Sequence, residues 1–261
     1  MKTKPFSVSA CSLLIVVALL SLCSYKACPK STNGDAQNET IVGNSDIVGA
    51  LDSESTGMAQ SHVFSNVPSE QATKGSTNHH DWVDLGLSVK WATCNVGASS
   101  PSGYGDYFAW GETHTKGTNA SYQWDNYKWF IGSLSPTYIC SKYGTADNKT
   151  CLEISDDAAS DNWGEPWRMP TDAEWTELRT KSTWTWTNGG YKVTGPNGNS
   201  IFLPAAGTAY RYEAGSTGYY WSSSLDTGDP NCAWDVIIDS DSVIRGSTIR
   251  CSGKSVRPVT E

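Results

Sequence analysis

Histidine is scarce in this chain: there are four in 261 residues, and only His114 lies beyond Trp82. None of the cysteines in that part of the chain has the Cys-x-x-Cys spacing that is typical of a zinc site. No pair of a nucleophile and a base stands out in the motifs either. We therefore expect no metal site and no cofactor, and we expect that the protein is not an enzyme.

Basic residues are also in the minority, with 19 Lys and Arg against 27 Asp and Glu, a net charge of −8 and a pI near 5.0. Binding to nucleic acid or to an anionic lipid surface needs a cluster of basic residues that neutralises phosphates. The composition therefore argues against nucleic acid as a partner, and it argues against direct binding to lipid headgroups.

The sequence lacks an apolar run that is long enough to span a bilayer. The longest run, Leu13–Leu20, follows Lys2 and Lys4 and has the length and flanking charge of a secretory signal peptide. Cys23 follows at the spacing of a lipoprotein processing site, with Cys28 as the second candidate and a plain signal peptide as the alternative. We expect an exported lipoprotein of the outer membrane or cell surface, lipidated at Cys23 and held to the membrane only by this anchor.

Aromatic residues are almost absent between the signal peptide (residues 1–28) and residue 81. Residues 29–80 contain no Trp or Tyr, and Phe64 is their only aromatic residue. Such a Ser-, Thr-, Asn- and Gly-rich segment cannot bury enough apolar surface to offset its chain entropy, so we expect a disordered, flexible tether. All twelve tryptophans lie in Trp82–Trp234. Residues 81–261 are therefore expected to form one domain with a sizeable core.

An odd number of cysteines falls in the expected domain. In an oxidising compartment they can form one or two disulfides, and at least one thiol must then remain free. The spacing leaves the connectivity open. The five residues are Cys94, Cys140, Cys151, Cys232 and Cys251.

The first half of the domain predicts strands and loops. Residues 82–92 are predicted as one strand with one buried face, because alternate positions are apolar. Residues 103–112 are predicted as an aromatic strand with tight turns at Gly105 and Gly111. Residues 113–149 are expected to form loops with short strands. The alternating apolar positions are Val83, Leu85, Leu87, Val89 and Trp91.

Two helices are predicted. The first runs from Asp156 to Asn162 with Ser155 as its cap. The second begins at a capping box formed by Thr171 and Glu174. Helix capping also accounts for the carboxylates near both helix starts, so they do not indicate a glycosidase. These carboxylates are Asp156, Asp157, Asp172, Glu174 and Glu177, and further strands are predicted at Tyr191–Val193, Ser200–Ala206, Gly218–Ser224, Ala233–Asp239 and Ser255–Val259.

The last forty residues alternate between framework and exchangeable positions. In the strand near residue 236, Trp234, Val236 and Ile238 are predicted to face the core, while Asp235, Ile237 and Asp239 face water. Together with Ile244 and Ile249, the exposed Ile237 suggests contact with a partner. An ordinary amphipathic hairpin is the alternative, because singly exposed apolar residues are common.

Six ordered segments resemble the Fibrobacter succinogenes major paralogous domain family, which is abundant in exported proteins of gut Bacteroidetes. The segment at residues 167–175 is also similar to formylglycine-generating sulfatase-modifying enzymes, which have a C-type-lectin-like fold. The resemblance implies an α+β, C-type-lectin-like domain with short helices and antiparallel strands. The matching segments are WVDLGLSVKWATCNVGA (82–98), YGDYFAWGE (104–112), WRMPTDAEWTEL (167–178), IFLPAAG (201–207), YYWSSS (219–224) and SVRPV (255–259).

The chain lacks the residues with which these similar proteins bind calcium and sugar or carry out catalysis. The calcium-binding sugar motifs of animal lectins are absent, and Asp229-Pro230-Asn231 is interpreted as a turn. The paired active-site cysteines of the formylglycine-generating enzymes are absent too. The resemblance therefore carries over no enzymatic activity.

Some members of the family are variable proteins of diversity-generating retroelements, in which asparagine-type codons near the gene's end are rewritten while a framework stays fixed. The resemblance places framework positions at Ala233, Trp234, Val236, Ser240, Val243, Arg245, Arg250 and Gly253. Asp241, Leu225, Asp226 and Cys232 match the variable pattern more loosely. The variable, ligand-binding positions are expected at Asp235, Ile237, Asp239, Asp241, Ile244, Gly246, Ser247, Thr248, Ile249, Cys251 and Ser252.

The leading functional hypothesis is a surface-displayed protein that binds a protein or glycan ligand through these C-terminal positions. The alternative is a fixed glycan-binding adhesin, or a fimbria-associated structural protein, whose tryptophans stack on sugars. Those tryptophans are equally compatible with core packing. They are Trp124, Trp129, Trp184 and Trp186.

Overall fold

A computed structural model describes residues 73–261, apart from 118–120, 135–136 and 210–211. The predicted signal peptide, the expected lipidation site Cys23 and residues 29–72 of the expected tether lie outside the described residues. Among the residues that are described, no helix is long and apolar enough to cross a membrane.

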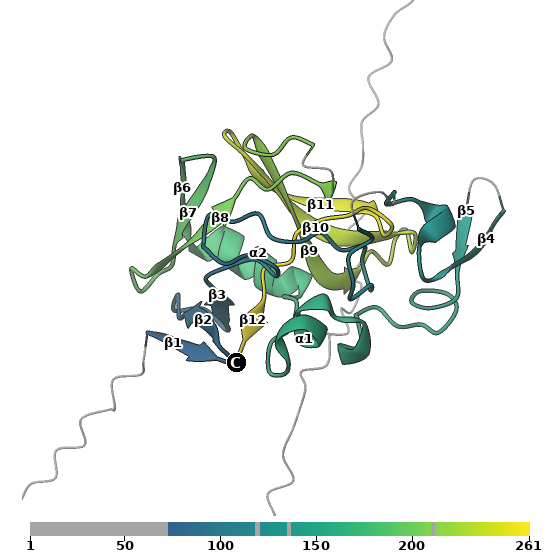
Figure 1. Ribbon diagram of the computed structural model, residues 1–261, viewed down its shortest axis with the longest axis horizontal. Helices are drawn as coiled ribbons and strands as arrows, with labels where there is room; N and C mark the ends of the chain where they lie inside the picture. Colours follow the sequence, from purple (N-terminus) through teal and green to yellow (C-terminus); the bar gives the residue numbers. More distant parts are fainter. Residues whose placement is uncertain (1–72, 118–120, 135–136, 210–211) are drawn as a thin grey trace, which may run out of the picture. The chain divides into compact units, whose positions relative to one another are not determined.

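The described part of the chain is a mixed, β-rich fold of short antiparallel strands with two short α-helices (Figure 1). One sheet has the order β1 (Lys74–Thr77), β2 (His80–Val83), β3 (Lys90–Ala92), β12 (Val259–Thr260). A second has the order β11 (Val243–Ile249), β10 (Cys232–Asp239), β9 (Thr217–Leu225). The third contains β6 (Thr183–Thr187), β7 (Gly190–Thr194) and β8 (Ser200–Pro204), and β4 (Phe130–Leu134) pairs with β5 (Thr137–Cys140). The helices are α1 (Ala158–Trp163) and α2 (Asp172–Lys181), with 3₁₀ turns η1 (Trp124–Asn126) and η2 (Ile154–Asp156).

Ordered structure begins earlier than residue 81. Strand β1 lies within the segment expected to be a tether, and it pairs with β2 so that Gly75 faces Trp82. The Trp82 ring lies where a side chain at position 75 would be, so the glycine lets this aromatic residue cover a polar strand. At the other end of the domain, β12 pairs with β3 and places Val259 opposite Trp91.

The predicted strand over residues 82–92 is wrong in one respect: it is two antiparallel strands, β2 and β3, joined by a loop. Gly86 has a φ of 74°, which only glycine adopts without strain, and the chain turns there. Val83 lies opposite Trp91. Burial still follows the alternating pattern, with Val83, Leu85, Val89 and Trp91 buried and Leu87 packed against them.

Residues 103–112 also differ from the predicted strand. Gly105 and Gly111 have φ values of 73° and 79°, which agrees with the expected tight turns. Between them the chain forms one isolated bridge, from Phe108 to Lys254, instead of a strand. The segment carries aromatic side chains into the core, as Phe108 and Trp110 are buried.

Both predicted helices form, with one change of cap. In α2 the Thr171 side chain accepts a hydrogen bond from the Glu174 amide, and the Glu174 carboxylate accepts one from the Thr171 amide, which confirms the capping box. In α1 the cap is Asp157 and not Ser155, because the Asp157 carboxylate accepts from the amides of Ala159 and Ser160.

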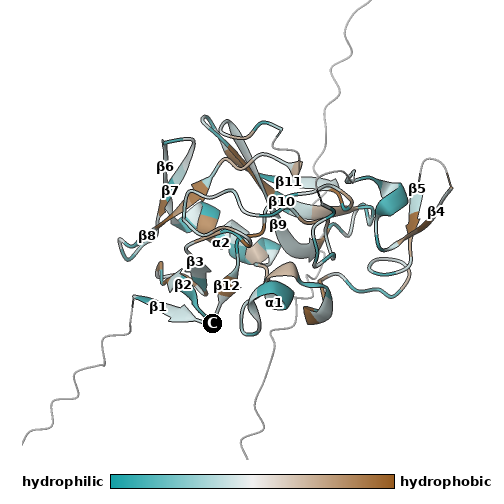
Figure 2. Ribbon diagram, viewed as in Figure 1, coloured by the Kyte–Doolittle hydropathy of each residue, from teal (hydrophilic) through white to brown (hydrophobic). Residues whose placement is uncertain are grey.

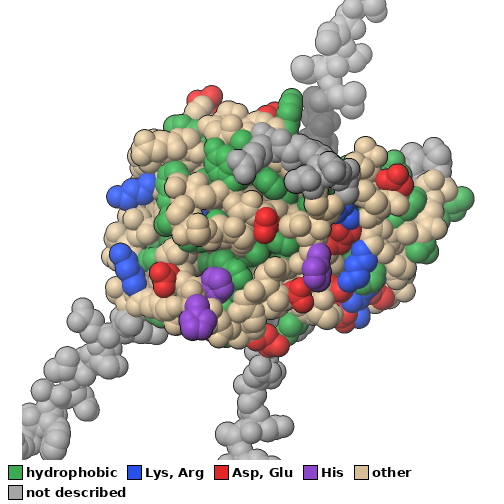
Figure 3. All heavy atoms as spheres, viewed as in Figure 1, with side chains coloured by type: hydrophobic (Ala, Val, Ile, Leu, Met, Phe, Trp, Pro, Cys, Tyr) green, Lys and Arg blue, Asp and Glu red, His purple; other side chains and the backbone are tan. Residues whose placement is uncertain are grey.

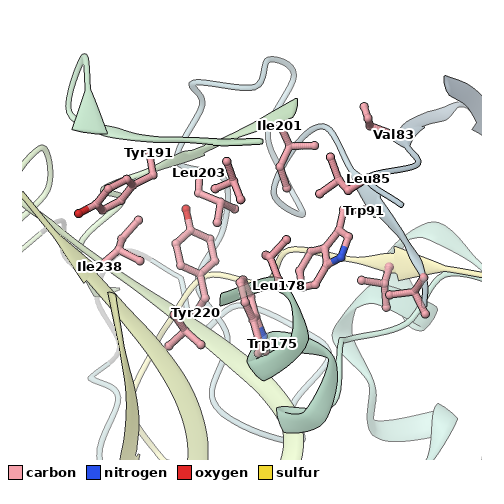
Figure 4. Close-up of a cluster of buried hydrophobic side chains, with 14 residues drawn as sticks. Val83, Leu85, Trp91, Trp175, Leu178, Tyr191, Ile201, Leu203, Tyr220 and Ile238 are labelled. Atoms are coloured by element: carbon pink, nitrogen blue, oxygen red, sulfur yellow. The ribbon is translucent and has the colours of Figure 1, made fainter. Parts of the chain in front are cut away.

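One of the main buried clusters joins α2 to the sheets (Figure 4). Trp175 and Leu178 of α2 point toward Trp91, Tyr220 and Ile238, and the Trp175 indole donates to the Trp221 carbonyl at 3.1 Å. One face of β9 and β10 is thus anchored to the helix. The β4–β5 hairpin is different: it carries hydrophobic residues (Figure 2) that remain exposed, among them Ile131 at 66 % and Leu134 at 73 %.

Candidate binding surface

Strand β11 replaces an expected loop. The sequence predicts a loop after Ile244, but residues 243–249 pair with β10 in a regular register from Ile238↔Val243 to Cys232↔Ile249. Gly246 and the small polar residues beside it obscured the strand pattern. Most of the expected ligand-binding positions therefore lie on a three-stranded sheet and not on a mobile loop.

The cross-strand register collects several of these positions on one side of the sheet. Residues that face each other in paired strands project to the same side, and the opposite side of β9 and β10 packs in the core. We name the other side the outer face, although one of its residues, Trp221, is itself buried in a second core cluster. It consists of Tyr219, Trp221, Asp235, Ile237, Ile244, Gly246 and Thr248.

Asp235 lies at the centre of the outer face, and the expectation that it faces water is wrong. Its side chain is buried and forms an ion pair with the ammonium group of Lys254, which is buried as well. The Thr248 hydroxyl donates to the same carboxylate at 3.0 Å. Lys254 belongs to the segment that follows β11, and it covers Asp235 because its ammonium lies over the rings of Trp221, at 4.4 Å, and Tyr219, at 5.4 Å.

Burial affects both partners of this pair. It lowers the pKa of the Lys254 ammonium, and the attraction of Asp235 opposes that effect. Asp235 Oδ1 is buried without a hydrogen-bond partner among the described residues. A Cβ at Gly246 would collide with Oδ1 and would lie 2.9 Å from Ile237 Cδ1. The centre of the outer face is thus closely packed around Asp235, Lys254 and Gly246.

Trp234, which was predicted to face the core, is only partly buried. Its ring is covered by the Arg245 guanidinium, whose Cζ lies 3.2 Å from the ring centroid. Arg245 also forms a two-point ion pair with Asp172 at the start of α2, with distances of 2.7 and 2.9 Å. Through these contacts, Trp234 and Arg245 link β10, β11 and α2.

The edge of the outer face is apolar and accessible. Ile244 is 48 % exposed and lies opposite Ile237, which is partly buried and itself lies opposite Tyr219. The Tyr219 hydroxyl donates to the Glu213 carboxylate at 2.5 Å, and burial together with this carboxylate raises the pKa of Tyr219. The three side chains form a continuous row across the sheet.

Asp239 and Asp241 lie at the turn between β10 and β11. The Asp239 carboxylate accepts from the amides of Asp241 and Ser242, at 2.9 and 2.8 Å, and these bonds hold the pKa of Asp239 below its ordinary value. Asp239 therefore has a structural role in the turn. Asp241 is exposed and free to contact a ligand.

The remaining expected positions lie toward the other end of β11. Ser247 is exposed and donates to Asp226, Ile249 is 42 % exposed, and Ser252 is partly buried. Cys251 is buried in a cluster beneath η1 and β5, and burial raises its pKa to about 11. Cys251 is therefore inaccessible to a ligand unless the surface opens.

Four of the five domain cysteines are free thiols, which confirms that at least one is unpaired. They are Cys94, Cys140, Cys232 and Cys251. Cys151 is disulfide-bonded.

The four tryptophans of the glycan hypothesis are all partly buried, and three of them support the core. Trp184 and Trp186 contact the edge of Tyr191, with centroids 5.4 and 5.1 Å apart. The Trp129 indole donates to the Gly111 carbonyl at 3.2 Å. Trp124 lines a surface groove.

The carboxylates near the helix starts have structural partners. Asp157 is fully buried as the α1 cap and also accepts from the Met169 amide, and burial raises its pKa to about 6. Glu174 forms a two-point ion pair with Arg168 at 2.8 and 2.7 Å. Over the described ranges, no group of three or more His, Cys, Asp or Glu residues is placed to hold a metal ion. On the face drawn in Figure 3, basic side chains occur in small groups among acidic ones.

Comparison of the chain with protein-family models, with curated proteins and with solved structures gave no match. Function is therefore inferred from the geometry of the surface and from the sequence motifs.

Proposed function

We propose that this chain is an exported, lipid-anchored binding protein of the Fibrobacter succinogenes major paralogous domain family, with a C-type-lectin-like scaffold. Its ligand surface is the accessible part of the outer face. The observation that carries the proposal is the row of Tyr219, Ile237 and Ile244, in which side chains cross the sheet on the side opposite the cluster around α2. Such a row at the edge of a sheet suits contact with a protein or glycan ligand.

The accessible positions of the outer face lie opposite the cluster around α2. Tyr220, Val236 and Ile238 on the opposite side of the same strands are buried against α2 and β7. Side chains on the accessible side can therefore change without altering the main cluster, as in other binding sites built on a rigid scaffold. This property is what a diversity-generating retroelement requires of its target, and we propose that this chain is such a target.

Sequencing the gene from a natural population of its host tests the proposal. Diversification predicts substitutions confined to adenines, in the codons for accessible positions such as Ile237, Ile244 and Ser247. Val236 and Ile238 lie on the core side of β10, the strand that carries Ile237. Their codons are the matched internal control and should not vary. A uniform sequence at all these positions would reject diversification of this gene.

The surface location of Ile244, on which its ligand-contact role depends, is tested separately by replacing Ile244 with Ser. Because Ile244 is half exposed, the variant should unfold within a few degrees of the parent protein in differential scanning calorimetry. The matched control is Ile238→Ser on the core side, which should lower the melting temperature strongly. A large drop for Ile244→Ser would show that this side chain is part of the core, and the proposed surface would be wrong.

A further inference from the structure

A shallow groove of about 350 Å³ lies beyond the outer face, where the end of β11 meets η1 and β5. None of the residues that define the outer face lines it. Its walls are three aromatic side chains, two polar side chains and the end of β11, with Cys251 at the base. The lining side chains are Tyr122, Gln123, Trp124, Asp125, Tyr138 and Ile249.

The aromatic rings of the groove are held in place by other rings. Trp124 and Tyr138 are stacked, with centroids 4.5 Å apart and planes inclined by 14°. Trp124 also contacts Tyr127 edge-on at 5.5 Å and Phe130 at 6.0 Å. Tyr138 remains 39 % exposed, so it is the ring that a ligand can reach. A ring that is fixed before binding loses little conformational entropy when a ligand stacks on it.

The polar groups of the groove are an amide and a carboxylate. Gln123 and Asp125 are both exposed, and no Lys, Arg or His is among the lining side chains. Among the cations near the groove along the chain, Lys128 is half exposed but is paired with Asp156, and Lys116 is nearly buried and is paired with Glu112. The groove therefore offers hydrogen-bond acceptors and an amide donor, but no positive charge for an anionic ligand.

We propose that this groove binds a neutral saccharide. The apolar C–H face of a sugar ring would stack on Tyr138, while its hydroxyl groups would bond to Gln123 and Asp125. An anionic ligand would meet the Asp125 carboxylate without a cation to balance it. A wholly apolar ligand would leave both polar groups without partners. The open shape suits the side or the end of a glycan chain more than an enclosed small molecule. The site is independent of the proposed role of the outer face.

The test is binding of the full-length protein to an array that carries neutral, sialylated and sulfated glycans, with immobilised choline as a cationic probe. We expect retention of a subset of neutral glycans. Tyr138→Ala and Asp125→Asn should each weaken binding of the best glycan by roughly tenfold or more, measured by calorimetric titration. Tyr212→Ala and Asp81→Asn are the matched controls, since both residues are exposed and outside the groove, and they should bind like the parent protein.

Melting temperatures of all variants must match that of the parent, and Trp124→Phe provides a second readout. Saccharide binding should change the tryptophan fluorescence of the parent protein, and this change should shrink in Trp124→Phe. The proposal is overturned if no neutral glycan is retained, if anionic glycans or choline bind preferentially, or if folded Tyr138→Ala binds as tightly as the parent. None of these results bears on diversification of the outer face, which is tested by the population sequences.

Discussion

Removal of the Asp235 carboxylate should destabilise the centre of the outer face. Asp235→Ala leaves the Lys254 ammonium buried without its ion-pair partner, while the rings of Trp221 and Tyr219 remain over it. Deleting one partner of a buried ion pair typically costs about 3–5 kcal/mol, because the remaining charge is not solvated. The cation–π contacts recover roughly 1–2 kcal/mol, so we expect a net loss of about 1–4 kcal/mol.

Urea unfolding followed by tryptophan fluorescence measures this loss as a change in the free energy of unfolding. The decisive comparison is the double variant Asp235→Ala with Lys254→Met, in which no buried charge remains. It should be more stable than Asp235→Ala alone, since replacing both members of a buried pair by apolar groups is often neutral. If the double variant is less stable than the single one, the loss comes from packing and not from an unpaired charge.

The pH dependence provides an independent check on the same pair. Burial holds the folded-state pKa of Lys254 below its ordinary value of 10.5, so the unfolded chain binds more protons between those two values. Stability should therefore rise as pH increases toward 10.5. In Asp235→Asn the attraction that raises the Lys254 pKa is lost, so the rise should begin at lower pH. Parallel stability–pH curves for parent and variant would contradict this account.

Three further predictions concern single sites. Gly246→Ala should lower the free energy of unfolding by about 1–3 kcal/mol because its Cβ collides with Asp235. In urea titrations, Gly246→Ala combined with Asp235→Ala should cost less than the sum of the two single changes. Thr171→Ala removes the cap of α2 and should cost about 1 kcal/mol, whereas Thr171→Ser should be nearly neutral; equal losses would contradict capping. Burial raises the pKa of Asp157 to about 6 from 3.8, so the folded state binds the extra proton. Relative to Asp157→Asn, the parent should lose stability as pH rises from about 4 to about 6, and a flat difference would contradict this.

The sequence correctly predicted elements that depend on interactions between residues close together in the chain. The capping box at Thr171 is one case, because its two hydrogen bonds involve residues three positions apart. The alternating apolar residues from Val83 to Trp91 predicted which side chains are buried, but not that the chain reverses between them. Alternation reports side-chain burial, and a loop turned at Gly86 can bury the same residues as a strand. The C-type-lectin-like assignment stays a prediction.

The site residues whose surroundings were predicted wrongly are those held by contacts between segments far apart in the sequence. Nothing next to Asp235 in the sequence indicates that Lys254, nineteen positions later, covers it. Strand β11 was missed because its stability comes from pairing with β10, while its own residues include Gly246 and several small polar side chains. The aromatic groove was also missed, since Tyr122 and Tyr138 meet Ile249 only in three dimensions. Asp125, three positions after Tyr122, gives no signal of a groove in the sequence.

The structure ranks the expected variable positions by the cost of changing them, and this ranking is a prediction about natural alleles. Asp241, Ile244, Ser247 and Ile249 are exposed, so most side chains should be tolerated there. At Asp235 a change removes the partner of buried Lys254, so it should be rare unless position 254 also differs.

A similar prediction about natural alleles applies to position 246, because a side chain there would contact Asp235. A residue larger than glycine at 246 should be found only in alleles with a smaller side chain at 235, because the two cannot occupy the same space. Population sequences with independent variation at 235 and 246 would show that this packing does not limit the surface. Paired variation would mean that packing between positions 235 and 246 limits which residues the centre accepts, with the accessible row at Ile237 and Ile244 available for ligand contact.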